Sequence, residues 1–357
     1  MLSKTLLFLI PGMLLVQCAP AVVTSVPLPE KARIQEQAEP VVHTQAELES
    51  LFGSWVEKAQ NPINFRLDGQ LRNQWRQLIS ETVWGEYARR CITAFLETGQ
   101  VSLTLEYRDY VRLRAALRNA AFRSTLSQDE QQLLAVLEQK AQKLLTPDMS
   151  DIEKLCALHD FLIQHSRYDA AGGGNIADVL YGGKGSCEAY SAAMCVLLEI
   201  AGIPSRVITG SADGGPHAWN LVRLNGAWYH VDATWDDPVI AAGQKQVLSH
   251  AYFCKTDAEL AATHVWSRRS YPASGTDTAL YYRSRGTYFT HFDAFWRAAM
   301  EAYRRGEPQF EGYLTTYGSP TQFQRKLQQA ATPDTPEKIG WNGPESAAGT
   351  VIVTFGS

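Results

Sequence analysis

The sequence predicts an α+β fold in which one helix packs on an antiparallel sheet, with small α/β segments on either side. A glycine-rich loop leads into an apolar run that begins at Cys187 and is stopped by Gly202 and Pro204, which predicts the helix. Asn225-Gly226 stands between two alternating apolar segments, which predicts a hairpin of the sheet. Helix and strand patterns also occur on both sides of this pair.

The composition is that of an ordinary globular protein. The chain has 357 residues, of which 45% are hydrophobic and 20% charged, with a net charge of −4. This length and apolar content predict two or three domains with ample core. The weak negative charge gives no reason to expect nucleic acid as a partner.

Residues 1–18 have the pattern of a signal peptide. Lys4 precedes an apolar stretch, Thr5 to Val16, that is too short to span a bilayer. The segment ends Leu-Val-Gln-Cys, which resembles a bacterial lipobox with Cys18 as the lipidated residue. Gln17 departs from that pattern, in which a small residue is usual. An uncleaved anchor, or ordinary cleavage near Ala19 or Ala21, is the alternative.

The lipobox resemblance implies a location. An exported chain with lipidated Cys18 would be a lipoprotein of the bacterial cell envelope, attached to a membrane through that residue. Ala19, rather than Asp, after the cysteine implies sorting to the outer membrane where the cell has one.

Residues 19–45 and 46–125 are expected to form a tether and an N-terminal α/β domain. The tether is rich in Pro, Val, Glu and Gln without a sustained period. In the domain, Gln74 to Leu96 is mostly helical in pattern, Val101 to Tyr107 alternates as a strand, and Tyr110 to Phe122 returns to helix.

Two capping boxes open the predicted core, residues 126–275. Ser127-x-x-Glu130 begins a helix that runs to about Leu145, and Ser150-x-x-Glu153 begins the next. A C-terminal α/β domain, residues 276–357, is predicted to follow. Its elements are a helix from Phe292 to Arg305, a strand around Phe310 to Tyr317, a helix from Pro320 to Ala331 and a strand from Thr350 to Phe355.

Cys187 is placed to be a reactive thiol. It lies in the first turn of its predicted helix, where the positive end of the helix dipole and free backbone N–H groups favour the thiolate. The thiolate is the nucleophilic form of cysteine.

The hairpin places a histidine beside an aspartate. With a two-residue turn at Asn225-Gly226, Leu224 faces Ala227, and His217 and Asp232 become diagonal neighbours on one face, roughly 7 Å apart between Cα atoms. A carboxylate at that distance can orient an imidazole. A slip of one residue would put the two side chains on opposite faces.

These segments together resemble the transglutaminase-like superfamily of papain-like folds. The resemblance is carried by G-S-C at a helix start, then G-I-P, H-A-W-N-L-V and W-Y-H-V-D-A-T-W-D-D-P, and covers roughly residues 151–270. It implies Cys187 as nucleophile, His217 as base and Asp232 as orienting carboxylate. The oxyanion would be held by the Cys187 backbone N–H and one more donor, with Tyr181 as the candidate and Tyr168 as the weaker one.

Other polar and sulfur-containing residues have simpler interpretations. His230 competes with His217, but its position nearer the hairpin tip favours packing or a place at the rim. His159 and His165 are expected at the surface or as capping groups. Cys91, Cys156, Cys195 and Cys254 are expected to be buried free cysteines. The sequence has no recognisable metal-ligand spacing and no cofactor motif, so neither metal nor cofactor is expected.

The predicted function is an exported thiol acyl-transfer enzyme that acts on amide or peptide substrates through a Cys-His-Asp triad. The acyl acceptor, amine or water, is left open. A cell-envelope cysteine peptidase or amidase is one alternative. A non-catalytic envelope scaffold or peptide-binding module is another, because a fold does not name its function.

Overall fold

A computed structural model describes residues 24–25, 39–75, 77–78, 86–95, 98–237, 248–343 and 349–356. The predicted signal peptide, with Cys18, lies outside these residues. Among the described residues, no helix has the length and apolar character needed to cross a membrane. The chain divides into two compact units. One holds residues up to Gln131 together with Thr209–His217, and the other holds the rest. The domain boundaries expected near residues 125 and 275 stay predictions.

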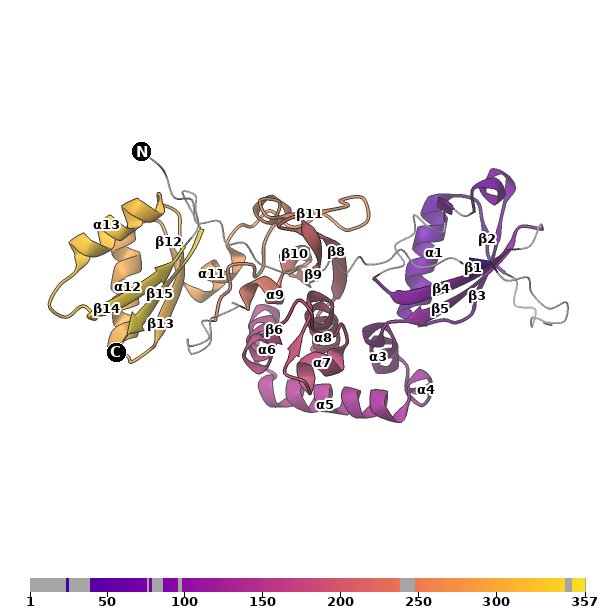
Figure 1. Ribbon diagram of the computed structural model, residues 1–357, viewed down its shortest axis with the longest axis horizontal. Helices are drawn as coiled ribbons and strands as arrows, with labels where there is room; N and C mark the ends of the chain where they lie inside the picture. Colours follow the sequence, from indigo (N-terminus) through magenta and orange to yellow (C-terminus); the bar gives the residue numbers. More distant parts are fainter. Residues whose placement is uncertain are drawn as a thin grey trace. The chain divides into compact units, whose positions relative to one another are not determined.

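The first unit is built on a five-stranded sheet with the strand order β1-β4-β5-β3-β2 (Figure 1). Its strands are β1 (Thr24–Ser25), β2 (Val41–Val42), β3 (Ile63–Leu67), β4 (Ala88–Phe95) and β5 (Gln100–Tyr107). Strands β1 and β2 fall inside the predicted tether and pair with β4 and β3. Helix α1 (Gln45–Glu57) begins with a capping box between Thr44 and Glu47.

The prediction of a helix from Gln74 to Leu96 is wrong over its second half. A 3₁₀ turn, η1 (Gly69–Gln74), precedes it, and Ala88–Phe95 forms strand β4 instead. Cys91 and Thr93 pair with Leu105 and Leu103 of β5, and all four side chains are buried. The spacing of apolar residues fits either period, so the non-local pairing with β5 decides the structure.

The other predicted elements of this unit are confirmed. Strand β5 covers the predicted strand, and helices α3 (Asp109–Arg118) and α4 (Ala120–Arg123) cover the predicted helix. Asn119 separates the two helices, because its side chain accepts hydrogen bonds from the amides of Ala121 and Phe122 and so begins a new helix.

Four helices precede or carry the predicted nucleophile. They are α5 (Gln128–Leu144), α6 (Asp151–His165), α7 (Ile176–Leu180) and α8 (Cys187–Ile200). Both predicted capping boxes are confirmed, Ser127 with Glu130 and Ser150 with Glu153. Helix α8 is apolar on every side, and every residue from Ala189 to Leu198 is buried, as expected for a central helix.

The central sheet has the strand order β10-β9-β8-β11. Strands β8 (Ser205–Ala212) and β9 (Gly215–Leu224) cross the boundary between the two units without a break, and β10 (Ala227–Val231) follows. The predicted register is confirmed: Ala227 pairs with Leu224, and Val231 pairs with Asn220. Asn225 and Gly226 have φ values of 50° and 86°, as a type I′ turn requires.

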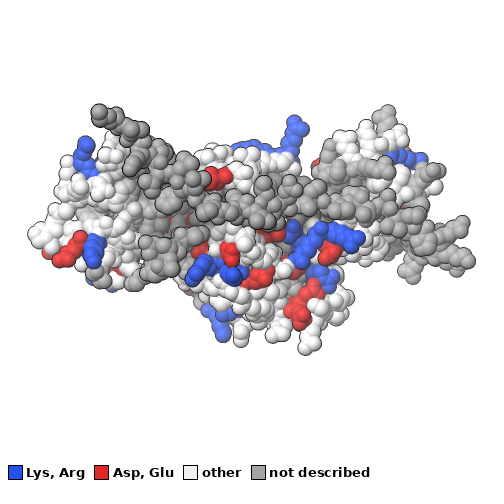
Figure 2. All heavy atoms as spheres, in the orientation of Figure 1, with Lys and Arg blue, Asp and Glu red and all other residues white. Residues whose placement is uncertain are grey.

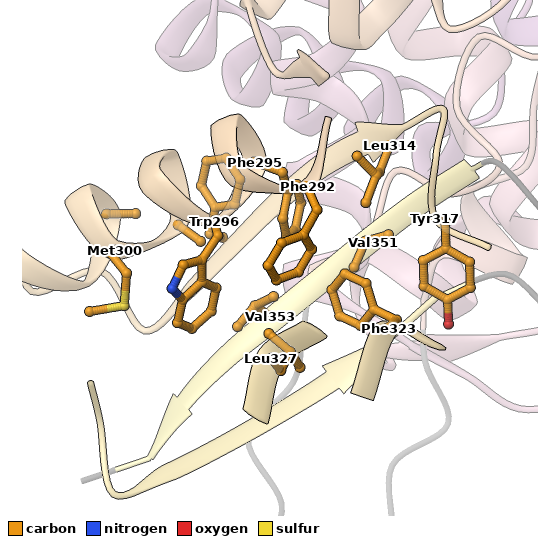
Figure 3. Close-up of a cluster of buried hydrophobic side chains, with 13 residues drawn as sticks. Phe292, Phe295, Trp296, Met300, Leu314, Tyr317, Phe323, Leu327, Val351 and Val353 are labelled. Atoms are coloured by element: carbon orange, nitrogen blue, oxygen red, sulfur yellow. The ribbon is translucent and has the colours of Figure 1, made fainter. Parts of the chain in front are cut away.

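The C-terminal elements form a separate small layer of helix on sheet. The sheet order is β12-β13-β15-β14, with β12 (Tyr288–Phe289), β13 (Gln309–Leu314), β14 (Lys338–Asn342) and β15 (Gly349–Gly356). Helices α12 (Phe292–Arg304) and α13 (Pro320–Ala330) contribute to an aromatic core that Figure 3 shows, in which Phe295 and Phe323 are fully buried. All four elements predicted here are confirmed.

Charged side chains are mixed in sign on the face that Figure 2 shows, where Lys and Arg stand beside Asp and Glu. On the described residues of that face there is no large basic patch of the kind that binds a phosphate backbone.

Candidate active site

Cys187 is the first residue of α8 and is half-buried. The preceding Ser186 is held by the Gly-rich loop, because its backbone N–H and its hydroxyl both donate to the carbonyl of Gly173, at 3.0 and 3.2 Å. The Ser186 side chain therefore makes no capping bond to α8. The positive end of the α8 dipole lies at Cys187.

The glycines before Cys187 are required by close packing. A Cβ at Gly173 would lie 2.0 Å from the Asp178 carboxylate, which caps α7 together with Asn175. A Cβ at Gly185 would lie 2.6 Å from a methyl of Val179 and 2.9 Å from Ala189. Any side chain at these positions would displace the segment that positions Cys187.

Hydrogen bonds of Tyr190 and Ser191 connect α8 to Asp237 and to strand β9. Tyr190, one turn after Cys187, donates its hydroxyl to Oδ2 of Asp237 at 2.6 Å, and the same oxygen accepts from the Tyr168 amide at 2.8 Å. Asn220 of β9 donates to the carbonyl of Ser191 at 3.0 Å. Asp237 therefore connects the start of α8 to strand β6 (Arg167–Tyr168), and Asn220 connects α8 to β9.

Asp232 lies at the end of β10 and is fully buried. Its Oδ1 accepts from the amides of Thr234 and Trp235, at 3.0 and 3.1 Å, and so caps the short helix α9 (Ala233–Asp236). Its Oδ2 lies 3.0 Å from Nε2 of His264, whose Nδ1 lies 2.8 Å from the Thr263 hydroxyl. These partners assign the His264 proton to Nε2, as the donor to Asp232.

His217 lies on β9 with 8% of its surface exposed. One ring nitrogen of His217, one carboxylate oxygen of Asp232 and one ring nitrogen of His264 lie within 4.8 Å of one another. The strand pairing ends at Val231, so Asp232 follows the ladder by one residue. A histidine and an aspartate predicted from the hairpin register are thus neighbours in the fold.

His264 is the residue that sequence reasoning missed. It belongs to strand β11 (His264–Trp266), which joins the sheet next to β8. It follows Asp232 by 32 residues, and the ten residues 238–247 between them are not described. The only local signal is the short alternating segment Thr-His-Val-Trp, which does not identify a partner.

His230 has other partners. It is fully buried, its Nδ1 accepts from the indole N–H of Trp219 at 3.0 Å, and its Nε2 lies 2.8 Å from Asp257. Burial lowers the pKa of His230, although the Asp257 carboxylate opposes that shift. Both ring nitrogens are therefore engaged, and the expectation that His230 has a packing role is confirmed.

The two tyrosines considered as oxyanion donors differ in environment. Tyr181 is 56% exposed at the end of α7. Tyr168 is half-buried, and its burial, together with the negative charges of Cys187 and Asp232, raises its pKa to about 12. Tyr168 is thus within electrostatic range of two of the predicted catalytic groups, and its hydroxyl stays protonated at neutral pH.

The expectation for His159 is wrong. It is fully buried, and its Nε2 lies 3.1 Å from Asp236, 77 residues away in sequence. It follows Leu155 by one turn on the buried face of α6, which also carries Leu158 and Leu162. All five described cysteines are free. Cys91, Cys195 and Cys254 are buried as expected, whereas Cys156 is only half-buried.

The chain is similar to known proteins over its central part. Residues 138–233 match the sequence profile of the Transglutaminase-like superfamily. Kyphoscoliosis peptidase of Homo sapiens is 25% identical over 123 residues, which are 29% of this chain and 19% of that protein. The Mus musculus protein is 25% identical over 158 residues, 39% of this chain and 22% of its own length. The chain thus spans about a fifth of these relatives.

Among solved structures, the periplasmic domain of TgpA from Pseudomonas aeruginosa is 20% identical. It covers 38% of this chain and 54% of its own, with a TM-score of 0.24. This structural likeness, and the match to a fifth of the relatives' length, give no information about the chemistry of the site. Taken with the mixed helix and sheet core, the profile match shows that this chain carries, over residues 138–233, a domain of the transglutaminase-like superfamily.

Proposed function

We propose that this chain is a thiol acyl-transfer enzyme that acts on amide bonds of protein or peptide substrates. Cys187 is the nucleophile, His217 the base and Asp232 the carboxylate that orients the base. The observation that carries the proposal is the buried group of His217 and Asp232 at the end of the hairpin. A buried carboxylate beside an imidazole selects its tautomer and stabilises its protonated form.

The reaction proceeds through a thioester. The Cys187 thiol gives its proton to His217, and the sulfur bonds to the carbonyl carbon while the carbonyl electrons move to oxygen. The oxyanion accepts hydrogen bonds from the first turn of α8 and from a tyrosine hydroxyl. When the C–N bond breaks, the leaving amine takes the proton from His217. Water or a second amine then attacks the carbonyl carbon of the thioester and gives a proton to His217. The C–S bond breaks, and the departing sulfur takes that proton from His217, which restores the Cys187 thiol and the neutral base.

Support for an activated thiol comes from its surroundings. Cys187 begins a 14-residue helix, is half-buried, and follows a loop whose glycines let the backbone approach closely. Cysteines at helix starts react as thiolates below the pH at which free thiols do. Tyr168 adds a protonated hydroxyl near Cys187.

Alkylation mapped by mass spectrometry tests the nucleophile. With iodoacetamide at a pH of about 6, below the ~8.5 of a free thiol, Cys187 should be modified faster than the other described cysteines. His217→Ala should slow this reaction, whereas His230→Gln, which changes a histidine bonded elsewhere, should leave it unchanged in protein that melts normally. Equal labelling of Cys187 in wild type and His217→Ala would refute the proposed base.

The acyl acceptor is tested separately. The protein is incubated with a peptide library, with and without a fluorescent primary amine. Incorporation of the amine identifies a transferase, and release of shortened or deamidated peptides identifies a peptidase or amidase. An unreactive Cys187 with no product of either kind would favour a scaffold or peptide-binding module.

We also propose export to the bacterial cell envelope, with membrane attachment through lipidated Cys18. The support is the lipobox-like end of residues 1–18. Metabolic labelling with a fatty-acid analogue should modify the wild type and not Cys18→Ser. Stable membrane anchoring takes more than one acyl chain, and the variant would carry none at this position. It should therefore leave the membrane fraction. A wild type without incorporated label would refute lipidation.

A further inference from the structure

A second cluster of reactive side chains lies on helix α6, apart from the residues of the proposed triad. Cys156 and Asp160 are one helical turn apart, so their side chains lie side by side, with Sγ 3.7 Å from Oδ2. His250 approaches from a turn far along the chain, with Nε2 2.9 Å from Oδ1 of Asp160 and 3.6 Å from Sγ of Cys156. A thiol, a carboxylate and an imidazole thus converge.

Glu311 fixes the orientation of the imidazole. Its Oε2 accepts from Nδ1 of His250 at 2.7 Å, and its Oε1 accepts from the backbone N–H of the same residue at 2.7 Å. Tyr282 donates its hydroxyl toward Oε1 at 3.0 Å. The Glu311 carboxylate therefore binds both the ring Nδ1 and the backbone N–H of His250. This orientation directs Nε2 of His250 at Cys156 and Asp160. A carboxylate on the far nitrogen is the usual outer partner of a metal-bound histidine.

The cluster is accessible from a cavity of about 400 Å³. Cys156 and Asp160 line it together with Tyr281, whose hydroxyl lies 3.7 Å from Sγ of Cys156. Glu153 and Arg285 also line the cavity. An ion or a small ligand can thus approach the thiol and the carboxylate, in contrast to the fully buried group around Asp232.

We propose that Cys156, Asp160 and His250 form a site for a divalent transition metal of the zinc class, with a fourth position open to the cavity. Tetrahedral zinc with sulfur at ~2.3 Å and nitrogen or oxygen at ~2.0–2.2 Å separates its ligands by about 3.4–3.6 Å. The 3.6 Å between Nε2 of His250 and Sγ of Cys156 matches this geometry, and Oδ2 of Asp160 lies 3.7 Å from the same sulfur. Oδ1, the other oxygen of Asp160, lies 2.9 Å from Nε2 of His250, which is the length of a hydrogen bond. To bind the metal, the carboxylate must turn or shift until one oxygen lies about 3.4 Å from Nε2 and about 3.6 Å from Sγ.

The competing state is a hydrogen-bonded ion network without metal. Burial disfavours a charged His250, but its bonds to Asp160, Cys156 and Glu311 outweigh burial and raise its pKa to about 12. When the metal binds, the proton of the ring's Nε2 and the proton of the thiol leave to solvent. Two protons are thus exchanged for one divalent ion, and the net charge of the cluster does not change.

Cobalt and zinc titrations of the full chain test the site. In a Cys187→Ser background, which removes the other half-buried thiol, Co²⁺ should bind with one equivalent and give a thiolate-to-cobalt absorption band that Zn²⁺ abolishes. Adding Cys156→Ser should remove the band and weaken binding by at least ~100-fold. Glu311→Gln, which leaves the three ligands in place, should weaken binding by about 10–100-fold.

Two further measurements complete the test. Zn²⁺ should protect Cys156 of the unmodified chain from alkylation, and thermal melts should show that Cys156→Ser is folded. The proposal is overturned if no stoichiometric Co²⁺ or Zn²⁺ binds, which would leave the ion network as the only state. It is also overturned if binding survives Cys156→Ser and is lost in His264→Leu, because the metal would then belong to the group around Asp232. Neither result bears on alkylation of Cys187.

Discussion

The two carboxylate oxygens of Asp232 have different partners: Oδ1 caps helix α9, and Oδ2 lies 3.0 Å from Nε2 of His264. His264 in turn is fixed by the hydroxyl of Thr263. The carboxylate is thus held on both oxygens before it can orient His217. In the proposed mechanism His264 is a positioning residue, since it acts through Asp232.

Replacement of His264 tests this role. His264→Leu removes a hydrogen bond to a buried carboxylate, which contributes about 1.5–3 kcal/mol, and should slow acyl-enzyme formation by about tenfold or more. His264→Gln places an amide N–H near the position of Nε2 and should recover most of the rate. Single-turnover thioester formation is the measurement. If Gln and Leu variants with equal melting temperatures are equally slow, His264 does not act through its donor.

Asp232→Asn should separate catalysis from folding. Asparagine retains the oxygen that caps α9, so the fold should persist, whereas the rate should fall by about 10⁴ because an amide favours the wrong histidine tautomer. Asp232→Ala should lose the same activity and about 1 kcal/mol of stability in addition, through loss of the cap. Thermal melts and probe-labelling rates of both variants give the comparison. An Asn variant with near wild-type labelling would remove Asp232 from the mechanism.

The two tyrosines can be compared directly as oxyanion donors. Tyr168→Phe should lower the acylation rate by about 10²–10³ if its hydroxyl binds the oxyanion. Because its pKa is raised to about 12, the hydroxyl stays protonated, and the ratio of wild-type to variant rates should be constant from pH ~6 to ~10. An ordinary phenol would already lose its proton near pH ~10.

Tyr181→Phe is the matched control, since Tyr181 is mostly exposed. Tyr168 is half-buried and lies within electrostatic range of Cys187, which favours it as the oxyanion donor. From the sequence, Tyr181 instead ranks first. A loss of rate in Tyr181→Phe with an unchanged rate in Tyr168→Phe would confirm Tyr181 as the oxyanion donor that the sequence predicts.

The parts of the site that sequence reasoning predicted depend on local signals. A glycine-rich loop, a helix stop and an Asn-Gly turn each act within a few residues, so the start of α8 and the register of β9 with β10 follow from the sequence alone. The pairing of β4 with β5 does not, because its apolar spacing fits helix as well as strand. The partner of buried His159 is Asp236, 77 residues away, which no local pattern reveals.

The contacts that complete both clusters are long-range. His264 reaches Asp232 across 32 residues, and Glu311 reaches His250 across 61. Single histidines and carboxylates at such separations are too common in a sequence to indicate a pair. The packing of β11 beside β8, and of β13 near the segment at His250, brings these pairs together.

The hairpin turn provides the last test, because the proximity of His217 and Asp232 depends on its register. Gly226 has a φ of +86°, and a Cβ there would meet no atom within 4 Å, so a substitution acts through the backbone alone. Gly226→Val should cost about 1–2 kcal/mol or more, since a β-branched residue resists positive φ. Gly226→Asn should cost less, because Asn225 beside it already adopts a φ of +50°.

Gly306 offers a matched control at the end of α12, with a φ of +81° and equally open space. Gly306→Val should lose comparable stability, measured by thermal melts, without changing the alkylation rate of Cys187 in folded protein. Gly226→Val should change both, because a slip of one residue would move His217 and Asp232 to opposite faces of the sheet. If the two valine variants melt alike and label alike, the turn does not set the geometry of the site, and His217 and Asp232 are held together by the surrounding core instead.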